Sequence, residues 1–287
     1  MGHALYEREP AARAVFDQAD ELLGFSLSTL CFEGPEEALT DTVNQQPALY
    51  VTSLAAWAVM QEQNYDEASF VAGHSLGEFS ALTAAGALSF EEGLALVRRR
   101  GQLMKAAGEA RPGAMAAILG LELEQIEEIC AQARVITGNP VQVANDNCPG
   151  QVVISGDETS LETALNLAEA AGARKIVRLP ITIAAHSPLM APAAMSFTRA
   201  VHEAVISPAT VPVIANTTAQ PIVKIEEIRT ELIAQLTGSV QWAPSMRYAR
   251  EQGVQRFIET GPGDVLTGLM KRIDRKVERV VFMGDGV

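Results

Sequence analysis

The 287-residue sequence predicts an α/β protein with a parallel-sheet core and one inserted α+β unit. Two observations lead to this fold class. Short apolar runs alternate with longer helical patterns along most of the chain, which is typical of a parallel sheet. Between residues 112 and 180 the order changes to strand–helix–strand–strand–helix–strand. With 48% hydrophobic residues, a chain of this length can bury a sizeable core.

The first third of the chain is expected to be mainly helical around one short strand. Residues 11–23 and 47–61 are rich in alanine and leucine, which favours helices. Residues 69–72 form a short apolar run that predicts a buried strand, and residues 76–87 then have a helical pattern. Residues 91–107 predict a further helix, with acids at its start and bases later, as the helix dipole prefers.

Pro112 and Gly113 mark the start of the inserted unit. Its order of elements is that of a ferredoxin-like fold. We therefore expect a ferredoxin-like subdomain at 112–180, inserted into a discontinuous large α/β core of residues 1–111 and 181–287. The expected elements are a strand at 114–119, a helix at 122–133, strands at 141–145 and 151–155, a helix at 158–171 and a strand at 175–179.

The last third returns to alternating strands and helices, which extends the predicted parallel sheet. The expected elements are a helix from 188, a strand at 211–215, helices near 225–236 and 243–251, a strand at 256–259 and a helix after 263.

Composition excludes several classes of function. A net charge of −13 argues against a nucleic-acid partner, and 5% aromatic residues is too few for a base-stacking surface. The three cysteines, Cys31, Cys130 and Cys148, have neither metal-ligand spacing nor the number for a disulfide framework. The longest apolar stretch, residues 47–60, is too short to cross a bilayer, and the sequence shows no signal peptide. We expect a cytoplasmic protein with no membrane partner.

The charge is unevenly distributed. Residues 1–97 hold two basic and 15 acidic residues, whereas the rest of the chain is balanced. Basic residues gather at 98–100, 174–178 and 271–276. If an acidic partner docks, we expect it to dock at these basic clusters. The acidic residues of 1–97 usually form no more than a solvated surface.

A candidate nucleophile is Ser75, in the Gly-His-Ser-Leu-Gly sequence of residues 73–77. The motif follows the expected strand and precedes the expected helix, the context of a nucleophile elbow. Such a turn lifts the hydroxyl above the sheet, and the Leu76 N–H would stabilise an oxyanion. The alternative is a packing turn with a buried serine.

A serine nucleophile needs a base, and His186 is the candidate that elimination leaves. His3 lies at the chain start, His202 lies among charged residues of an expected helix, and His74 is next to Ser75, so its ring should point away and line the pocket. The alternative for a lone histidine is a structural role. The position of His186 differs from an ordinary α/β-hydrolase, where the base lies near the C-terminus.

Arg100 falls on the apolar stripe of the helix at 91–107, whereas Arg98 and Arg99 do not. A buried guanidinium needs a carboxylate partner, which could be a substrate acid or a residue of the protein, unless the side chain extends to solvent. A serine, a base and a buried arginine together suggest transfer of an acyl group that is itself an acid.

Seven segments in order along the chain closely resemble the malonyl-CoA:acyl carrier protein transacylases of fatty acid synthesis and the acyltransferase domains of polyketide synthases. The segments are 46–49 (Gln-Pro-Ala-Leu), 73–81 (Gly-His-Ser-Leu-Gly-Glu-Phe-Ser-Ala), 100–104 (Arg-Gly-Gln-Leu-Met), 113–117 (Gly-Ala-Met-Ala-Ala), 149–156 (Pro-Gly-Gln-Val-Val-Ile-Ser-Gly), 240–242 (Val-Gln-Trp) and 261–266 (Gly-Pro-Gly-Asp-Val-Leu).

The resemblance implies a hydrolase-like core with a ferredoxin-like subdomain and a role for each candidate residue. Ser75 would be the nucleophile, His186 the base, Arg100 the partner of the malonyl carboxylate, and His74 part of the pocket wall. The base would be oriented by a main-chain carbonyl at Gln235. The reaction would pass malonyl from malonyl-CoA to the phosphopantetheine thiol of an acyl carrier protein, with no metal or redox cofactor.

Two departures from the family pattern bear on activity. The family begins with a strand and a Gly-Gln-Gly loop that supplies a second oxyanion donor, and residues 1–6 resemble the segment after that loop. We therefore expect this chain to lack the loop. Ala184 and Ala185 precede the base and are smaller than the residues of some relatives, which leaves the choice between malonyl and branched malonyl groups open. The alternatives to a transferase are a serine esterase or thioesterase, and a truncated non-catalytic copy that binds carrier protein.

Overall fold

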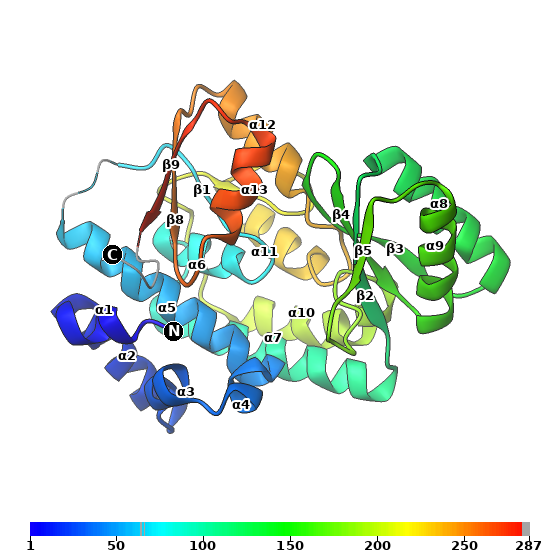
Figure 1. The fold of residues 1–287 in the computed structure, drawn as a ribbon. Coiled ribbons are helices and arrows are strands. Elements are labelled where there is room, and N and C mark those ends of the chain that lie inside the picture. The colour runs from blue at the N-terminus through cyan, green and yellow to red at the C-terminus, as the bar shows by residue number, and fades with distance from the viewer. Residues whose placement is uncertain (64, 66, 283–287) are drawn as a thin grey trace.

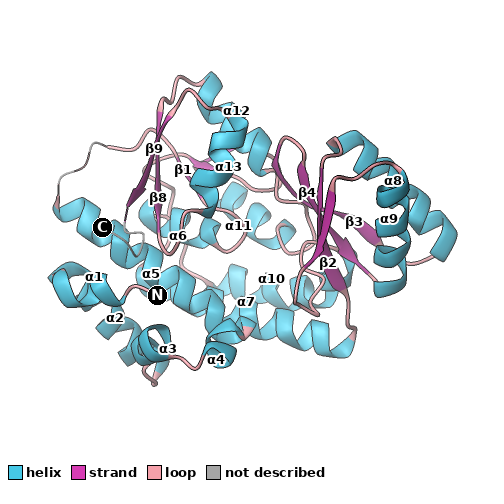
Figure 2. Cartoon of the chain, in the orientation of Figure 1, coloured by secondary structure: helices cyan, strands magenta, loops and turns pink. Residues whose placement is uncertain are grey.

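The computed structural model describes residues 1–63, 65 and 67–282. Two bodies are visible in Figure 1. The larger one contains the first and the last described residues of the chain, and the smaller one is built from the middle of the chain, coloured green. Figure 2 shows that helices surround the strands of the larger body and cover one face of the sheet in the smaller body.

Helices make up the N-terminal part of the chain. The two predicted helices are present, and the second begins earlier than expected because Asp41 caps it and Pro47 is accommodated inside it. Three short helices were not predicted, since each is too short for a clear periodicity. The helices are α1 (His3–Arg8), α2 (Pro10–Leu23), α3 (Leu27–Glu33), α4 (Glu36–Thr40) and α5 (Thr42–Glu62).

The smaller body is a four-stranded antiparallel sheet with two helices packed on it. The strand order is β3-β4-β2-β5, and its helices share an apolar cluster with the sheet. Its elements are β2 (Ala114–Leu119), α8 (Leu123–Thr137), β3 (Val141–Cys148), β4 (Gln151–Gly156), α9 (Glu158–Ala170) and β5 (Lys175–Arg178), close to the predicted ranges.

The strands of the larger body are short. β1 (Val71–Ala72) pairs in parallel with β6 (Val213–Ile214), and β6 pairs antiparallel with β7 (Pro221–Ile222), which the sequence did not predict. β8 (Arg256–Thr260) pairs in parallel with β9 (Glu278–Phe282), also unpredicted. Parallel pairing is therefore present, but not as the single sheet that the sequence predicted. In the described part of the chain, β8 and β9 form a sheet separate from that of β1, β6 and β7, and β7 is antiparallel.

The remaining helices pack around these strands. Fully buried aromatic side chains from four helices, Phe16, Tyr50, Phe79 and Phe197, lie in one apolar cluster that holds α2, α5, α6 and α10 together. The helices of the larger body that follow β1 are α6 (Gly77–Ala84), α7 (Phe90–Ala110), η1 (Pro188–Met190), α10 (Ala191–Glu203), α11 (Ile225–Ala234), α12 (Trp242–Glu251) and α13 (Val265–Ile273).

Main-chain hydrogen bonds join the smaller body to the larger one. Val240, after α11, exchanges main-chain hydrogen bonds with Ala144 and Asp146 of β3 at 2.8 and 2.9 Å. Helix α7 runs beneath both bodies in Figure 1. Within the described residues, no helix is both long and apolar enough to cross a membrane.

Candidate active site

Ser75 lies on a tight turn between β1 and α6. Its φ is 51°, in the left-handed region that residues other than glycine rarely adopt. The turn requires glycine at position 73, because a Cβ there would lie 1.9 Å from the carbonyl carbon and oxygen of Gly77. At Gly77 itself a Cβ would meet no atom within 4 Å. The turn thus has the strained geometry of a nucleophile elbow.

Asn216 holds the main chain of this turn. Its Oδ1 accepts a hydrogen bond from the Ser75 N–H at 2.7 Å, and its Nδ2 donates to the Gly73 carbonyl at 2.7 Å. Sequence reasoning missed this residue. Its position after a predicted strand could have indicated it. Ser75 follows β1 and Asn216 follows β6, and the carboxyl ends of parallel strands lie at the same edge of a sheet.

His186 is the histidine that reaches the hydroxyl of Ser75. Its Nε2 lies 2.8 Å from Ser75 Oγ. Its Nδ1 lies 2.8 Å from the carbonyl oxygen of Gln235 and 3.1 Å from that of Gly238. Since carbonyls only accept, the proton sits on Nδ1 and Nε2 is free to accept from the hydroxyl. Burial and the Arg100 charge lower the pKa of His186 to about 3, which keeps the ring neutral.

The loop carrying His186 is held from both bodies. The His186 N–H donates to the Leu236 carbonyl at 3.1 Å. Gln142 on β3 donates to the carbonyls of His186 and Thr237, both at 2.9 Å. The φ of His186 is 57°, so this loop, like the Ser75 turn, holds a residue in a left-handed conformation. Sequence reasoning did not single out Gln142.

Arg100 is buried beside the serine, with 1% of its surface exposed. Its Nη2 donates to Ser75 Oγ at 3.1 Å and to Gln235 Oε1 at 2.9 Å. Its Nε is buried and finds no acceptor, and no carboxylate of the described residues lies within ion-pair distance of its guanidinium. Burial lowers its pKa to about 10. An unpaired guanidinium next to a nucleophile is suited to bind a carboxylate.

His74, Leu76 and Gln235 border this group. The His74 ring turns to the smaller body, where Nε2 lies 2.8 Å from Asn147 Oδ1. The Leu76 N–H makes no hydrogen bond among the described residues and lies at the N-terminal end of α6, as an oxyanion donor must. Gln235, which by itself resembles an exposed helix residue, is fully buried. His3 and His202 are exposed and have no hydrogen bond or ion pair with Ser75.

Of the basic cluster at 98–100, Arg99 is exposed at the surface. Arg100 is buried, and Arg98 donates to the Val43 carbonyl and to Asn44. The expectation of a docking surface is therefore wrong for Arg100, and for the rest of the cluster it stays a prediction. In the described part of the chain, no group of three or more histidine, cysteine, aspartate or glutamate residues could hold a metal ion.

Comparison with known proteins identifies the family. The acyl transferase domain matches residues 1–282. The malonyl CoA-acyl carrier protein transacylase of Bacillus subtilis is 45% identical over 280 residues, which are 98% of this chain and 88% of that protein. The transacylase of the same name from Escherichia coli K12 is 40% identical over 264 residues, 92% of this chain and 85% of that protein.

Solved structures agree with this result. The transacylase of Coxiella burnetii superposes with a TM-score of 0.93 at 40% identity, covering 96% of this chain and 86% of that chain. A malonyl-transacylase in complex with a type II polyketide synthase acyl-carrier protein gives a TM-score of 0.94 at 38% identity, covering 98% and 90%. These matches confirm the predicted fold class. The chain belongs to the acyl transferase domain family, and within it to the malonyl-CoA:acyl carrier protein transacylases.

Proposed function

We propose that this protein transfers a malonyl group from malonyl-CoA to the phosphopantetheine thiol of an acyl carrier protein through a malonyl-Ser75 ester. One observation carries the proposal: Ser75 Oγ lies within hydrogen-bond distance of both a neutral imidazole, at 2.8 Å, and a guanidinium without a carboxylate partner, at 3.1 Å. The first contact supports a nucleophile and the second a substrate acid.

Acylation follows from this geometry. Ser75 Oγ attacks the thioester carbonyl of malonyl-CoA while His186 Nε2 takes the hydroxyl proton. The Leu76 N–H and the N-terminal end of α6 stabilise the oxyanion. The carbon–sulfur bond then breaks, and the proton on Nε2 passes to the sulfur of coenzyme A. The Gln235 carbonyl accepts from Nδ1 throughout, which stabilises the imidazolium that forms.

Transfer to the carrier reverses these steps with a different thiol. The phosphopantetheine thiol gives its proton to His186 Nε2 and attacks the ester, and Ser75 leaves with that proton. Arg100 binds the malonyl carboxylate in both halves of the cycle. The reaction so written uses no metal or redox cofactor, and the coenzyme A thioester is its substrate.

We assign residues 112–180 to a ferredoxin-like subdomain and residues 1–111 with 181–287 to the acyltransferase core. The separate apolar clusters of the two bodies support this division. We also place the enzyme in the cytoplasm, because its three cysteines are buried and unpaired, which fits a reducing compartment.

Intact-mass analysis tests the proposal. Incubation with malonyl-CoA should add one malonyl group to the wild-type chain and none to Ser75→Ala. Adding holo acyl carrier protein should then move the group to the carrier. Release of free malonate at the same rate without a carrier would make the protein an esterase, and no adduct on the wild-type chain would make it a non-catalytic copy.

A further inference from the structure

We propose that Glu78 is a positioning residue that holds the side-chain amide of Gln235 in the orientation that Arg100 requires. The inference rests on the proposed function, since Arg100 is assigned there to the malonyl carboxylate. Glu78 lies in the first turn of α6 and is fully buried. It touches neither reacting group directly, so its effect on the reaction passes through its neighbours.

Both oxygens of Glu78 accept hydrogen bonds from residues around Ser75. Oε1 accepts from the Asn216 main-chain N–H at 2.9 Å, and Oε2 accepts from Nε2 of Gln235. A carboxyl group with two N–H donors and no acceptor around it is suited to the ionised, acceptor-only form. Burial and the Glu231 charge raise the pKa of Glu78, whereas the two N–H donors and the Arg100 charge act in the opposite direction.

The amide of Gln235 has one orientation that satisfies its surroundings. Its Nε2 donates to Glu78 and, at 2.9 Å, to the Ser75 carbonyl, while its Oε1 accepts from Arg100 Nη2 at 2.9 Å. Turning the amide over would place an oxygen against two oxygens and an NH₂ group against a guanidinium. Glu78 therefore helps to fix which end of the amide Arg100 meets.

This arrangement also explains how a buried arginine remains available to a ligand. Arg100, the Gln235 amide and the Glu78 carboxyl group form a hydrogen-bonded chain. The amide oxygen accepts from the guanidinium, so Arg100 has a hydrogen-bond partner without a direct ion pair that would occupy it. The unpartnered Nε of Arg100 remains free for a substrate carboxylate.

The test is the ratio of malonyl to acetyl loading on Ser75, measured by mass from the two coenzyme A thioesters. Glu78→Gln replaces one of the two carboxyl oxygens with an NH₂ group, so either the Asn216 N–H or Nε2 of Gln235 loses its acceptor. We expect the ratio to fall at least about tenfold, since leaving a buried donor unsatisfied is worth about that factor or more. A defect in the fold alone would lower both loadings together.

A double-mutant cycle shows whether Glu78 acts through Gln235. Gln235→Met keeps the main-chain carbonyl that faces His186 but removes the amide. In that background Glu78→Gln should change the ratio by less than about twofold, because the link is already broken. Equal effects of Glu78→Gln in both backgrounds would overturn the inference.

Asp146→Asn is the matched control. Asp146 is also buried, but it lies on β3, and among the described residues its side chain has no hydrogen bond with Glu78, Gln235 or Arg100. The loading ratio of this variant should equal that of the wild-type chain. If Glu78→Gln does not fold, Gln235→Met decides alone: a lowered ratio supports the inference and an unchanged one overturns it. Failure of the wild-type chain to load malonyl would instead overturn the proposed function.

Discussion

The Nδ1 of His186 lies 2.8 Å from the main-chain carbonyl oxygen of Gln235, in the place that an aspartate takes in a Ser-His-Asp triad. A carbonyl orients the ring and favours the protonated ring through its hydrogen bond, but it lacks the full negative charge of an aspartate. Burial and Arg100 act in the opposite direction and lower the pKa of His186 from its ordinary value of 6.5 to about 3. The ring of His186 is oriented by a main-chain oxygen, which remains in place when the side chain of Gln235 is substituted.

The first prediction concerns pH. Because His186 stays neutral until the pH approaches about 3, the rate of malonyl loading on Ser75 should be nearly constant between pH 8 and pH 5. Rapid-quench loading with mass detection measures this rate. A tenfold fall centred near pH 6.5 would show that the ring titrates normally.

The same shift affects stability. The unfolded chain protonates this histidine below its ordinary value of 6.5, whereas the folded chain does so only near 3, so the free energy of unfolding should fall as pH drops through that interval. His186→Gln should show a smaller fall in urea titrations at pH 6.5 and pH 5. An equal fall of the free energy of unfolding between pH 6.5 and pH 5 in both proteins would contradict the assignment of this pH dependence to His186.

Arg100→Ala should lose malonyl loading at least about tenfold. The substitution removes one partner of the buried charge pair that Arg100 would form with the malonyl carboxylate, and such a truncation costs roughly 2–5 kcal/mol. Acetyl loading should fall much less, since acetyl has no carboxylate. Arg99→Ala is the control, because Arg99 lies on the same helix and is exposed. Equal losses of malonyl and acetyl loading in Arg100→Ala would make the residue structural.

The two glycines of the elbow should respond differently to alanine. Gly73→Ala should destabilise the fold by about 1–3 kcal/mol or more, as overpacking does, because its Cβ would overlap the main chain of Gly77. Gly77→Ala should leave the melting temperature unchanged or raise it, since it lies in a helix with open space. Calorimetry of both variants tests this, and equal destabilisation would refute the stated reason.

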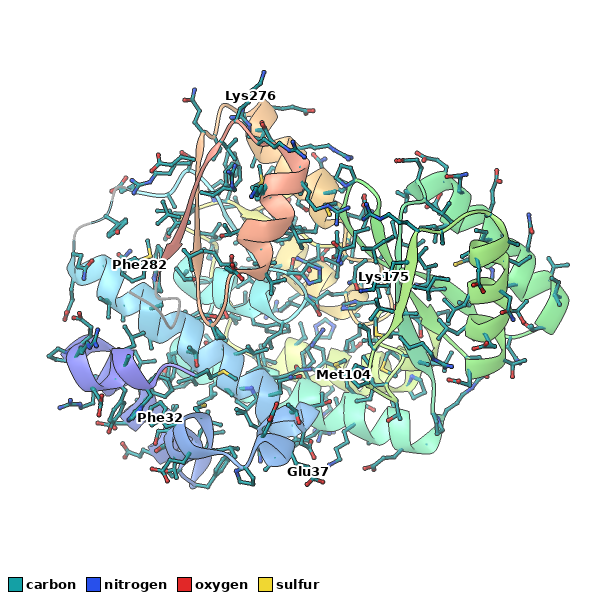
Figure 3. All side chains as sticks on the ribbon, in the orientation of Figure 1. Phe32, Glu37, Met104, Lys175, Lys276 and Phe282 are labelled. Carbon is teal, nitrogen blue, oxygen red and sulfur yellow. The ribbon has the colours of Figure 1, made fainter. Side chains whose placement is uncertain are left out.

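Acyl carrier protein should dock near α13. Arg272 there donates to the Pro149 carbonyl at 2.8 Å, in the turn that follows Asn147, the partner of His74. Lys276 projects from the loop beyond α13 in Figure 3. Lys271→Glu should raise the KM for an acidic carrier and weaken the salt dependence of transfer.

Arg199→Glu makes the same change in net charge on α10, where Arg199 pairs with Glu203 at 2.7 Å, and should leave the KM for the carrier unchanged. Identical effects of the two reversals would show that net charge alone matters and that docking is not localised at α13.

Local patterns in the sequence were sufficient for part of this site. The elbow at Ser75 is contiguous and lies between a short strand and a helix, so a motif of neighbouring residues was sufficient to predict it. Arg100 was found by helical periodicity, and its burial confirms that its position on the apolar stripe was meaningful. His186 was reached by elimination among four histidines, and its distance from Ser75 agrees with that choice.

The sequence by itself was sufficient to predict the turn at residues 73–77, the burial of Arg100, the order of elements between residues 112 and 180, and the family. Tertiary structure alone decided what surrounds them. Asn216, Gln235 and Glu78 form one hydrogen-bonded group with Ser75, although Asn216 and Gln235 lie 141 and 160 residues further along the chain than the serine. No local period connects such residues. They meet because β1 and β6 pair in parallel and α11 ends beside that edge, which places polar side chains where burial forces them to hydrogen-bond to one another.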